Sequence, residues 1–221
     1  MSQDCFQLID ANERLQHCFK AKTEEESVQY YDQWSSNYEH DIVEEHRYRG
    51  PQQLVEFLQQ HVIDRNALII DIGAGSGLVG KLLRANGFQT IDAHDGSEKM
   101  LEIAKSRGIY RNAYEEIFYE KTESKVIPPR AYDVAASVGT FLPGHLNQNH
   151  IEAFIGAVKP GGQLIFGMNE HSETEEFVAR LKQLEQSNTL QLITRKVYEE
   201  YRYDVATQQI HKGVYYAYLV N

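Results

Sequence analysis

The 221-residue sequence predicts an α/β fold in which helices cover both faces of a mostly parallel β-sheet. Three observations support this prediction. An apolar run over 68–72 leads through a glycine-rich turn into an amphipathic segment, as a buried parallel strand followed by a helix would. Similar strand and helix patterns then alternate along the chain. Finally, two tyrosine-rich segments of alternating polarity, 192–203 and 210–220, indicate a terminal β-hairpin.

The order of the remaining elements follows from the same patterns. A helix begins at Pro51, and the chain ahead of it, 1–50, is expected to form a helical and aromatic cap on a single compact unit spanning 51–221. Further helices are expected at 5–20, 98–107, 151–158 and 173–186. Further strands are expected at 90–95, within 111–118, at 132–138 and at 163–169.

The composition limits the kinds of partner that the protein is expected to bind. The formal charge of −10 argues against broad electrostatic binding to nucleic acid or to an anionic membrane. The two cysteines, Cys5 and Cys18, provide neither a disulfide framework nor a metal-binding cluster, and suit a reducing cytosol. No secretory leader and no membrane-spanning apolar run is visible. We therefore expect a cytoplasmic protein, a monomer or weak dimer, with no nucleic-acid or membrane partner.

The glycine-rich turn is Gly73-Ala74-Gly75-Ser76-Gly77. Glycines at alternate positions let the backbone approach a ligand, and the helix that follows presents free N–H groups toward it. A dinucleotide fingerprint, G-x-G-x-x-G, would need a third glycine where this chain has Leu78. The spacing therefore favours a nucleotide-type cofactor that lacks the pyrophosphate of NAD.

Further candidate ligand-binding residues lie at the ends of the strands that follow the glycine-rich turn. Asp95 ends the second strand 22 positions after Gly73, about where nucleotide-binding α/β folds accept hydrogen bonds from ribose hydroxyls. Glu115 or Glu116, near the end of the third strand, is a candidate acceptor for an adenine amino group. Ser137 lies near the end of the fourth strand, at the sheet edge where ligands of parallel sheets sit.

Aromatic residues gather ahead of the first strand. Segment 30–41 holds three tyrosines and the only tryptophan, Trp34. These side chains fit either a lid over an adenosyl group or an organic substrate, or ordinary packing. Tyr48 and Arg49 follow just before the helix at Pro51. Arg49 fits either a partner of a bound amino-acid carboxylate or a solvated arginine.

Several of these motifs resemble the class I S-adenosylmethionine-dependent methyltransferases. The Asp71-to-Gly77 pattern resembles their motif I, and the turn Lys159-Pro160-Gly161-Gly162 is also similar. Within that class, the chain is most similar to the Williams-Beuren-region methyltransferase-like proteins, through 31–34, 48–51 and the pair Gly144-His145. The resemblance implies a Rossmann-like fold with a mostly parallel seven-stranded sheet, a C-terminal antiparallel hairpin and helices on both faces.

The resemblance also implies a function and a set of site residues. It implies S-adenosylmethionine as cofactor and methyl transfer to an unidentified small-molecule or protein acceptor. Met100 stands where such enzymes place an apolar side chain against the adenine ring. The expected cofactor-binding residues are Tyr31, Trp34, Tyr48, Arg49, Asp71, Gly73, Gly75, Gly77, Asp95, Gly96, Met100, Glu115 and Ser137.

Catalysis of methyl transfer depends mainly on alignment, because the donor is already a sulfonium electrophile. His145, in the loop after the fourth strand, is the candidate general base or acceptor-orienting group. The alternative is a loop histidine exposed to water. His150 and His171 are rival candidates.

Other functions remain as alternatives. A dinucleotide-dependent oxidoreductase is disfavoured by Leu78 and by the terminal hairpin, and a non-catalytic cofactor-binding or scaffold protein stays open. The sequence lacks both the [D/N/S]-P-P-[Y/F] motif that holds an exocyclic base amine and a cysteine placed to attack cytosine. We therefore do not expect a nucleic-acid substrate. The run 169–171 with Glu173 contains the ligand types of a divalent-metal site, but the fourth-strand loop offers no acidic partner. We therefore expect no metal.

Overall fold

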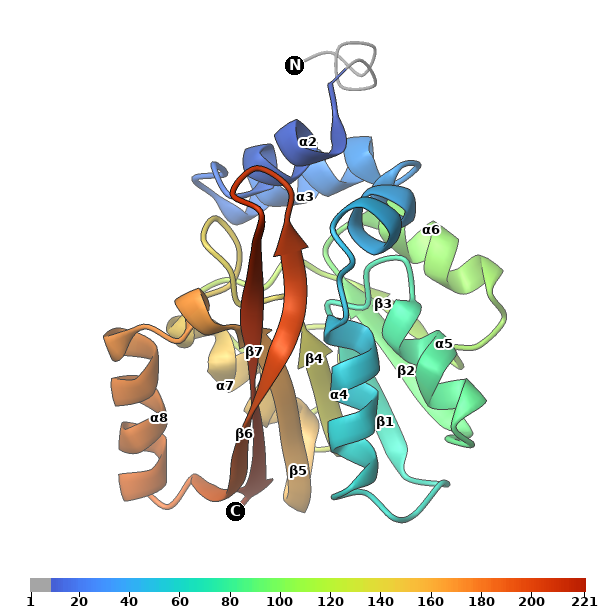
Figure 1. The fold of residues 1–221 in the computed structure, drawn as a ribbon. Coiled ribbons are helices and arrows are strands. Elements are labelled where there is room, and N and C mark those ends of the chain that lie inside the picture. The colour runs from blue at the N-terminus through green and yellow to red at the C-terminus, as the bar shows by residue number, and fades with distance from the viewer. Residues whose placement is uncertain (1–8) are drawn as a thin grey trace.

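The computed structural model describes residues 9–221, and its strands form a seven-stranded sheet of order β3-β2-β1-β4-β5-β7-β6 (Figure 1). Neighbours among β1 to β5 pair in parallel, whereas β7 pairs antiparallel with both β5 and β6. The predicted fold is therefore confirmed. The strands are β1 Leu68–Ile72, β2 Thr90–Asp95, β3 Ala113–Glu115, β4 Tyr132–Val138, β5 Val158–Asn169, β6 Leu190–Asp204 and β7 Gln209–Val220.

Helices cover both faces of the sheet. Successive residues of a strand point to opposite faces, so each strand packs against helices on both sides. Ile69 packs in a cluster with residues of α4 and α5, whereas Ile70 belongs to the cluster that contains residues of α7 and α8. Leu101 of α6 packs on Ala93, which shares the face of α5. The bounds are α4 Gly50–Gln59, α5 Leu78–Ala85, α6 Glu98–Ser106, α7 Ile151–Ala157 and α8 Glu175–Gln186. Within the described residues, no helix is long and apolar enough to cross a membrane.

A few boundaries differ from expectation. The third strand is only three residues long, Ala113–Glu115, and pairs with β2 alone at the edge of the sheet. The fifth strand begins at Val158 rather than at Gln163, because the lysine-proline-glycine turn stays within the ladder through an irregular register with β4. The helix expected at 5–20 is α2, Ala11–Cys18, and the part of that expectation before residue 9 lies outside the described residues.

A cap of three helices lies across the carboxyl ends of the parallel strands (Figure 1). It consists of α2, α3 Glu24–Trp34 and the π-helix η1 His40–Glu45. Asp41 holds the cap together. Its buried carboxylate accepts hydrogen bonds from the guanidinium of Arg14 and from Nε1 of Trp34, the latter at 2.7 Å.

Asp32 docks this cap on the sheet domain. Its Oδ1 accepts from the hydroxyl of Ser97 at 2.6 Å and from the backbone N–H of Lys99 at 3.3 Å. Ser97 is the N-cap of α6, and its Oγ also accepts from the N–H of Met100. The cap is therefore joined to the sheet domain at the start of α6. Two short 3₁₀ helices, η2 Gln148–His150 and η3 Glu170–Ser172, complete the described fold.

We expect Asp41→Ala to loosen the cap and leave the sheet intact. The change leaves the buried Arg14 charge without its carboxylate, which typically costs about 3 to 5 kcal/mol. Hydrogen exchange should quicken throughout α2, α3 and η1 and stay slow in the central strands. Glu44→Ala, an exposed acid on the same π-helix, is the control. Unchanged exchange in the cap of Asp41→Ala would contradict the anchoring role.

Candidate functional site

The glycine turn joins β1 to α5 at the carboxyl end of the sheet. Gly73 has φ +70°, and a Cβ there would come within 2.1 Å of the Thr140 side chain. Gly75 has φ +54°, and a Cβ there would meet no atom within 4 Å. Gly73 is thus required by close packing. The backbone of Gly75, in contrast, borders open space that a ligand can approach.

Asp95 lies beside this turn. Its Oδ2 accepts from the N–H of Gly75 at 2.7 Å, and its Oδ1 accepts from the N–H of Ser97 at 2.9 Å. Burial raises the pKa of this carboxyl group. Each oxygen keeps a further lone pair, so the carboxylate can still accept hydrogen bonds from ligand hydroxyls.

A cavity opens between the glycine turn and the cap, and we call it the glycine-turn cavity. It brings together eight of the residues that the sequence predicted. These are Tyr31, Gly73, Gly75, Asp95, Gly96, Met100, His145 and Glu116, the second of the two adjacent glutamates considered; the lining also includes Tyr38, His94, Phe118 and Thr140.

Three predicted residues lie under the turn and do not line the cavity. Asp71 is buried and accepts from the hydroxyl of Tyr110 at 2.7 Å. Burial raises the pKa of Asp71 to about 7. Gly77, at φ +90°, packs against Tyr110 and α6. Ser137 is buried and donates to the carbonyl of Ile72 at 2.8 Å. These three residues therefore support the glycine turn and the strands beside it without contacting the cavity.

Two predicted residues lie away from the cavity. Arg49 is exposed, pairs with Glu200 at 2.8 Å and lines neither cavity. Glu115 is exposed on β3, and the next residue, Glu116, lines the cavity instead. Successive residues of an extended segment point in opposite directions, and β3 is too short for its pattern to show which one points inward.

His94 is a cavity residue that the sequence did not indicate. Its ring is buried, stacks on Phe118 with 4.0 Å between ring centroids, and has no hydrogen-bond partner among the described residues. Burial lowers the pKa of His94 to about 3, so the ring is neutral. Buried polar atoms without partners are rare, and here they border an open cavity. The signal available in the sequence was the position of His94, directly before Asp95 at the carboxyl end of β2.

His145 is half-buried in the cavity wall and is not freely solvated. Its Nδ1 lies 3.0 Å from the carbonyl of Pro143, which can only accept, so Nδ1 carries the hydrogen. Its Nε2 therefore accepts from the hydroxyl of Tyr31 at 2.8 Å. Burial lowers the pKa of His145 to about 4. The imidazole is neutral at neutral pH, and its free nitrogen already binds Tyr31.

The rival histidines lie elsewhere. His150 is buried, accepts from the N–H of Asn147 at 3.1 Å, and faces Glu24 at 3.2 Å. It lines neither this cavity nor the next. His171 follows β5 and lines a second cavity.

The second cavity, which we call the aromatic pocket, adjoins the first beneath the cap. Tyr31, Tyr38 and Gly139 line both cavities and form the wall between them. Trp34 and Tyr48, predicted to close the site, line only the aromatic pocket. The other lining residues are Leu15, Cys18, Phe19, Ile42, Leu142, Pro143, Asn169, His171, Ser172, Tyr201 and Arg202.

Comparison with known proteins identifies the family. Methyltransferase-like protein 27 of Homo sapiens is 31% identical over 168 residues, which cover 73% of this chain and 67% of the human protein. This chain is a class I S-adenosylmethionine-dependent methyltransferase. The family described as a methyltransferase domain matches residues 70–166 of the enzyme, from β1 into β5. The oxidoreductase and the non-catalytic alternatives find no support among these matches.

Solved structures agree with the fold of this methyltransferase. The [4+2]-cyclase SpnF superposes with a TM-score of 0.67 at 13% identity, covering 90% of this chain and 97% of that protein. An S-adenosylmethionine-dependent methyltransferase from Thermotoga maritima superposes with a TM-score of 0.59 at 16% identity, covering 86% and 98%. At these identities the likeness shows the fold alone.

We expect Asp71→Asn to stabilise the methyltransferase at neutral and higher pH. The raised pKa means that folded Asp71 keeps its proton up to about pH 7, whereas the unfolded chain loses it near pH 3.8. Stability linked to this group is thus complete below about pH 4 and is lost as pH rises toward 7. Asparagine does not ionise, so the gain should approach about 4 kcal/mol above pH 7 and vanish near pH 4.

Urea denaturation at several pH values measures this effect. Asp133→Asn serves as a control for which the opposite change in stability is expected. Asp133 is also partly desolvated, but its ion pair with Lys159 and the N–H of Leu68 lower its pKa. That variant should lose stability at neutral pH. Equal stability of wild type and Asp71→Asn at pH 8 would show that folding does not raise the pKa of Asp71.

Proposed function

We propose that this methyltransferase binds S-adenosylmethionine in the glycine-turn cavity and methylates a small organic molecule held in the aromatic pocket. The shared wall of Tyr31, Tyr38 and Gly139 carries this proposal, because methyl transfer needs donor and acceptor sites in direct contact. A donor bound there would supply an electrophilic methyl carbon. A lone pair of the acceptor atom would form the new bond to that carbon as the carbon–sulfur bond breaks, and the sulfur would keep the electron pair of the broken bond.

The donor is assigned to the glycine-turn cavity on chemical grounds. Asp95 is placed to accept hydrogen bonds from ribose hydroxyls, and the open space beside Gly75 leaves room for the adenosyl group. Met100 offers an apolar surface to the adenine ring. His94 has two ring nitrogens without partners, which a polar ligand in this cavity can satisfy.

The acceptor is assigned to the aromatic pocket by its lining. Aromatic side chains of the cap and of β6 surround it, which suits an organic body with a flat or apolar surface. Arg202 is the cationic group of the lining, and its buried Nη1 has no hydrogen-bond partner among the described residues. Its Nη2 lies 3.7 Å from Asp204. An acceptor with an acidic or carbonyl oxygen would satisfy the free Nη1.

His145 is proposed to orient Tyr31 rather than to act as a general base. A base is most effective when its pKa lies near the working pH, and burial lowers the pKa of His145 to about 4. The bond from Tyr31 to Nε2 of His145 fixes a phenol ring in the wall that both cavities share. His145 is thus a positioning residue, and the reaction depends on alignment.

We expect S-adenosylmethionine and its demethylated product to bind in calorimetry, while NAD and NADP do not. Asp95→Ala should weaken donor binding by roughly 1.5 to 3 kcal/mol, or about tenfold to a hundredfold, because it removes hydrogen bonds to a charged group. Affinity for the wild type should also fall as pH is lowered through the raised pKa of Asp95. Glu115→Ala, exposed outside the cavity, is the matched control.

Two results would contradict the donor assignment. One is micromolar binding of NAD without binding of the methyl donor. The other is an unchanged dissociation constant in a folded Asp95→Ala variant, which would remove Asp95 from the ribose site.

We expect methyl-labelled donor to label the small-molecule fraction of a cell extract and to leave the protein fraction unlabelled. With the acceptor so identified, His145→Ala and Tyr31→Phe should each lower turnover by about tenfold or more and leave donor affinity nearly unchanged. The double variant should be no worse than the more impaired single variant, because both changes remove one interaction.

The pH profile separates positioning from base catalysis. A positioning role predicts that the rate shows no His145-dependent fall between pH 8 and pH 6, since the pKa of this residue is lowered to about 4. A fall with an apparent pKa near 6.5 that disappears in His145→Ala would establish the base role instead. Label found only in protein would overturn the small-molecule acceptor.

A further inference from the structure

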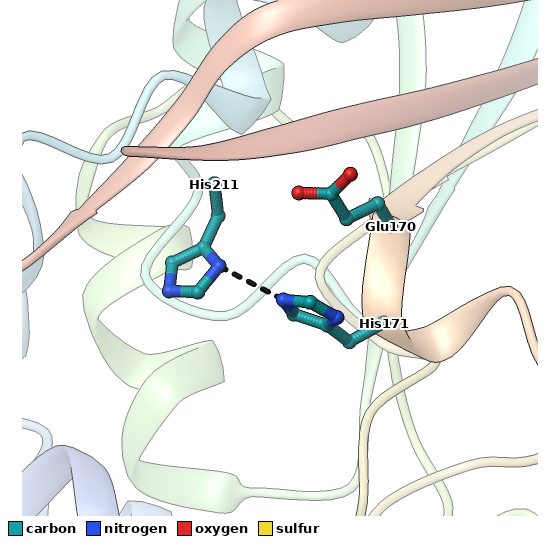
Figure 2. A group of neighbouring side chains, drawn as sticks. All are labelled: Glu170, His171 and His211. Atoms are coloured by element: carbon teal, nitrogen blue, oxygen red, sulfur yellow. Dashed lines mark hydrogen bonds between the residues drawn. The ribbon is translucent and has the colours of Figure 1, made fainter. Parts of the chain in front are cut away.

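A second cluster of chemically competent side chains lies at the rim of the aromatic pocket. Glu170, His171 and His211 each direct one ligand-type atom toward the others, and these atoms lie within 4.8 Å of one another (Figure 2). Nε2 of His171 is 3.2 Å from Nδ1 of His211. His171 also lines the aromatic pocket, so the cluster adjoins the proposed acceptor site.

The sheet holds these three residues in register. β5 and β7 are antiparallel, and their pairing ends at Asn169 opposite Gly213. Residues just after Asn169 therefore lie beside residues just before Gly213. The N–H of Lys212 donates to Oε1 of Glu170 at 3.1 Å and fixes that carboxylate. The cluster thus rests on adjoining strands and a short helix.

The spacing of the two imidazoles suits a tetrahedral metal ion. With metal–nitrogen bonds of about 2.0 to 2.1 Å, two nitrogens at a tetrahedral centre stand about 3.3 Å apart. The two nitrogens share a hydrogen bond at 3.2 Å in this structure, which agrees with that separation, so a metal ion would take the place of the shared proton. Glu170 supplies a third ligand of the kind found in two-histidine, one-glutamate zinc sites, and a fourth position stays open.

Asp204 supplies the outer contact that such a site needs. Its Oδ2 lies 3.6 Å from Nε2 of His211, a buried nitrogen that has no hydrogen-bond partner among the described residues. A carboxylate there favours the tautomer with hydrogen on Nε2, which leaves the lone pair of Nδ1 pointing at His171.

We propose that Glu170, His171 and His211 form a binding site for one zinc-class divalent ion at the rim of the aromatic pocket. Only two of these residues, Glu170 and His171, belong to the metal-ligand pattern noted in the sequence, and the fourth-strand loop offers no acidic partner. The missing ligand comes instead from β7, 40 positions beyond His171. The site stands independently of the donor assignment, because none of its ligands lines the glycine-turn cavity.

The test uses untagged, chelator-treated full-length protein, titrated with Zn²⁺ in a calorimeter and with Co²⁺ followed by visible absorption. We expect one equivalent of Zn²⁺ to bind with a Kd of about 1 μM or lower, and Co²⁺ to give a tetrahedral spectrum. His171→Ala and His211→Ala should each weaken binding at least about 100-fold. Asp204→Asn should weaken it about tenfold to a hundredfold, the range for outer-shell partners.

A matched control comes from the cap. His40 and Glu45 form an exposed pair at 3.7 Å, and neither belongs to the cluster, so His40→Ala should leave the affinity unchanged. His171 is exposed, so its alanine variant keeps the test valid even if His211→Ala does not fold. The proposal is overturned if wild type shows no saturable Zn²⁺ binding below about 100 μM, or if folded His171→Ala binds as wild type does. Donor calorimetry on metal-free protein tests the proposed function separately.

Discussion

Hydrogen bonds that converge on Asp95 and Ser97 join the three parts on which the site depends. Asp95 accepts from the glycine turn and from the backbone of Ser97, while the hydroxyl of Ser97 donates to Asp32 of the cap. The turn after β1, the start of α6 and the cap are therefore set relative to one another by one short chain of polar contacts. Such contacts are strong in a buried setting, and leaving a member unpaired there costs more than the bond contributes.

The wall between the two cavities combines apolar aromatic faces with the polar hydroxyl of Tyr31. Tyr31 presents its ring to Trp34 and Tyr38, and its hydroxyl to His145. Burial raises the pKa of Tyr31 well above its ordinary range, so the phenol stays protonated and keeps donating to His145. The apolar faces exclude water from the pocket, and the hydrogen bond to His145 fixes the ring angle.

Sequence patterns predicted the positions of the strands, the parallel or antiparallel pairing of the strands, and the glycine turn. These features depend on local periodicity and on backbone conformation. The fold follows from such patterns, and so does the position of Asp95 at the end of β2. Contacts between distant segments left no comparable signal. Tyr31 and His145 are 114 positions apart, and only the docking of the cap brings them together. His211 likewise meets His171 through strand pairing, and the pattern of β7 does not reveal which residue reaches η3.

Residue-level assignments were least predictable where an element is short or exposed. Glu115 and Glu116 are adjacent, and the three-residue strand β3 gives no pattern that separates them. Arg49 has the chemistry of a carboxylate partner, but Glu200 on the neighbouring β6 satisfies it at the surface. In both cases the side chain's direction depends on packing that a single sequence does not encode locally.

The buried triad of Asp41, Arg14 and Trp34 makes the cap one stiff body rather than a set of independent loops. Tyr31 and Tyr38, which border both ligand cavities, belong to that body. Under the proposed function, movement of the cap as a unit would expose both cavities together, so release of the spent donor and of the methylated product would be kinetically coupled. The residence time of each would then depend on how often the hydrogen bond between Asp32 and Ser97 breaks, as well as on the ligand's own contacts.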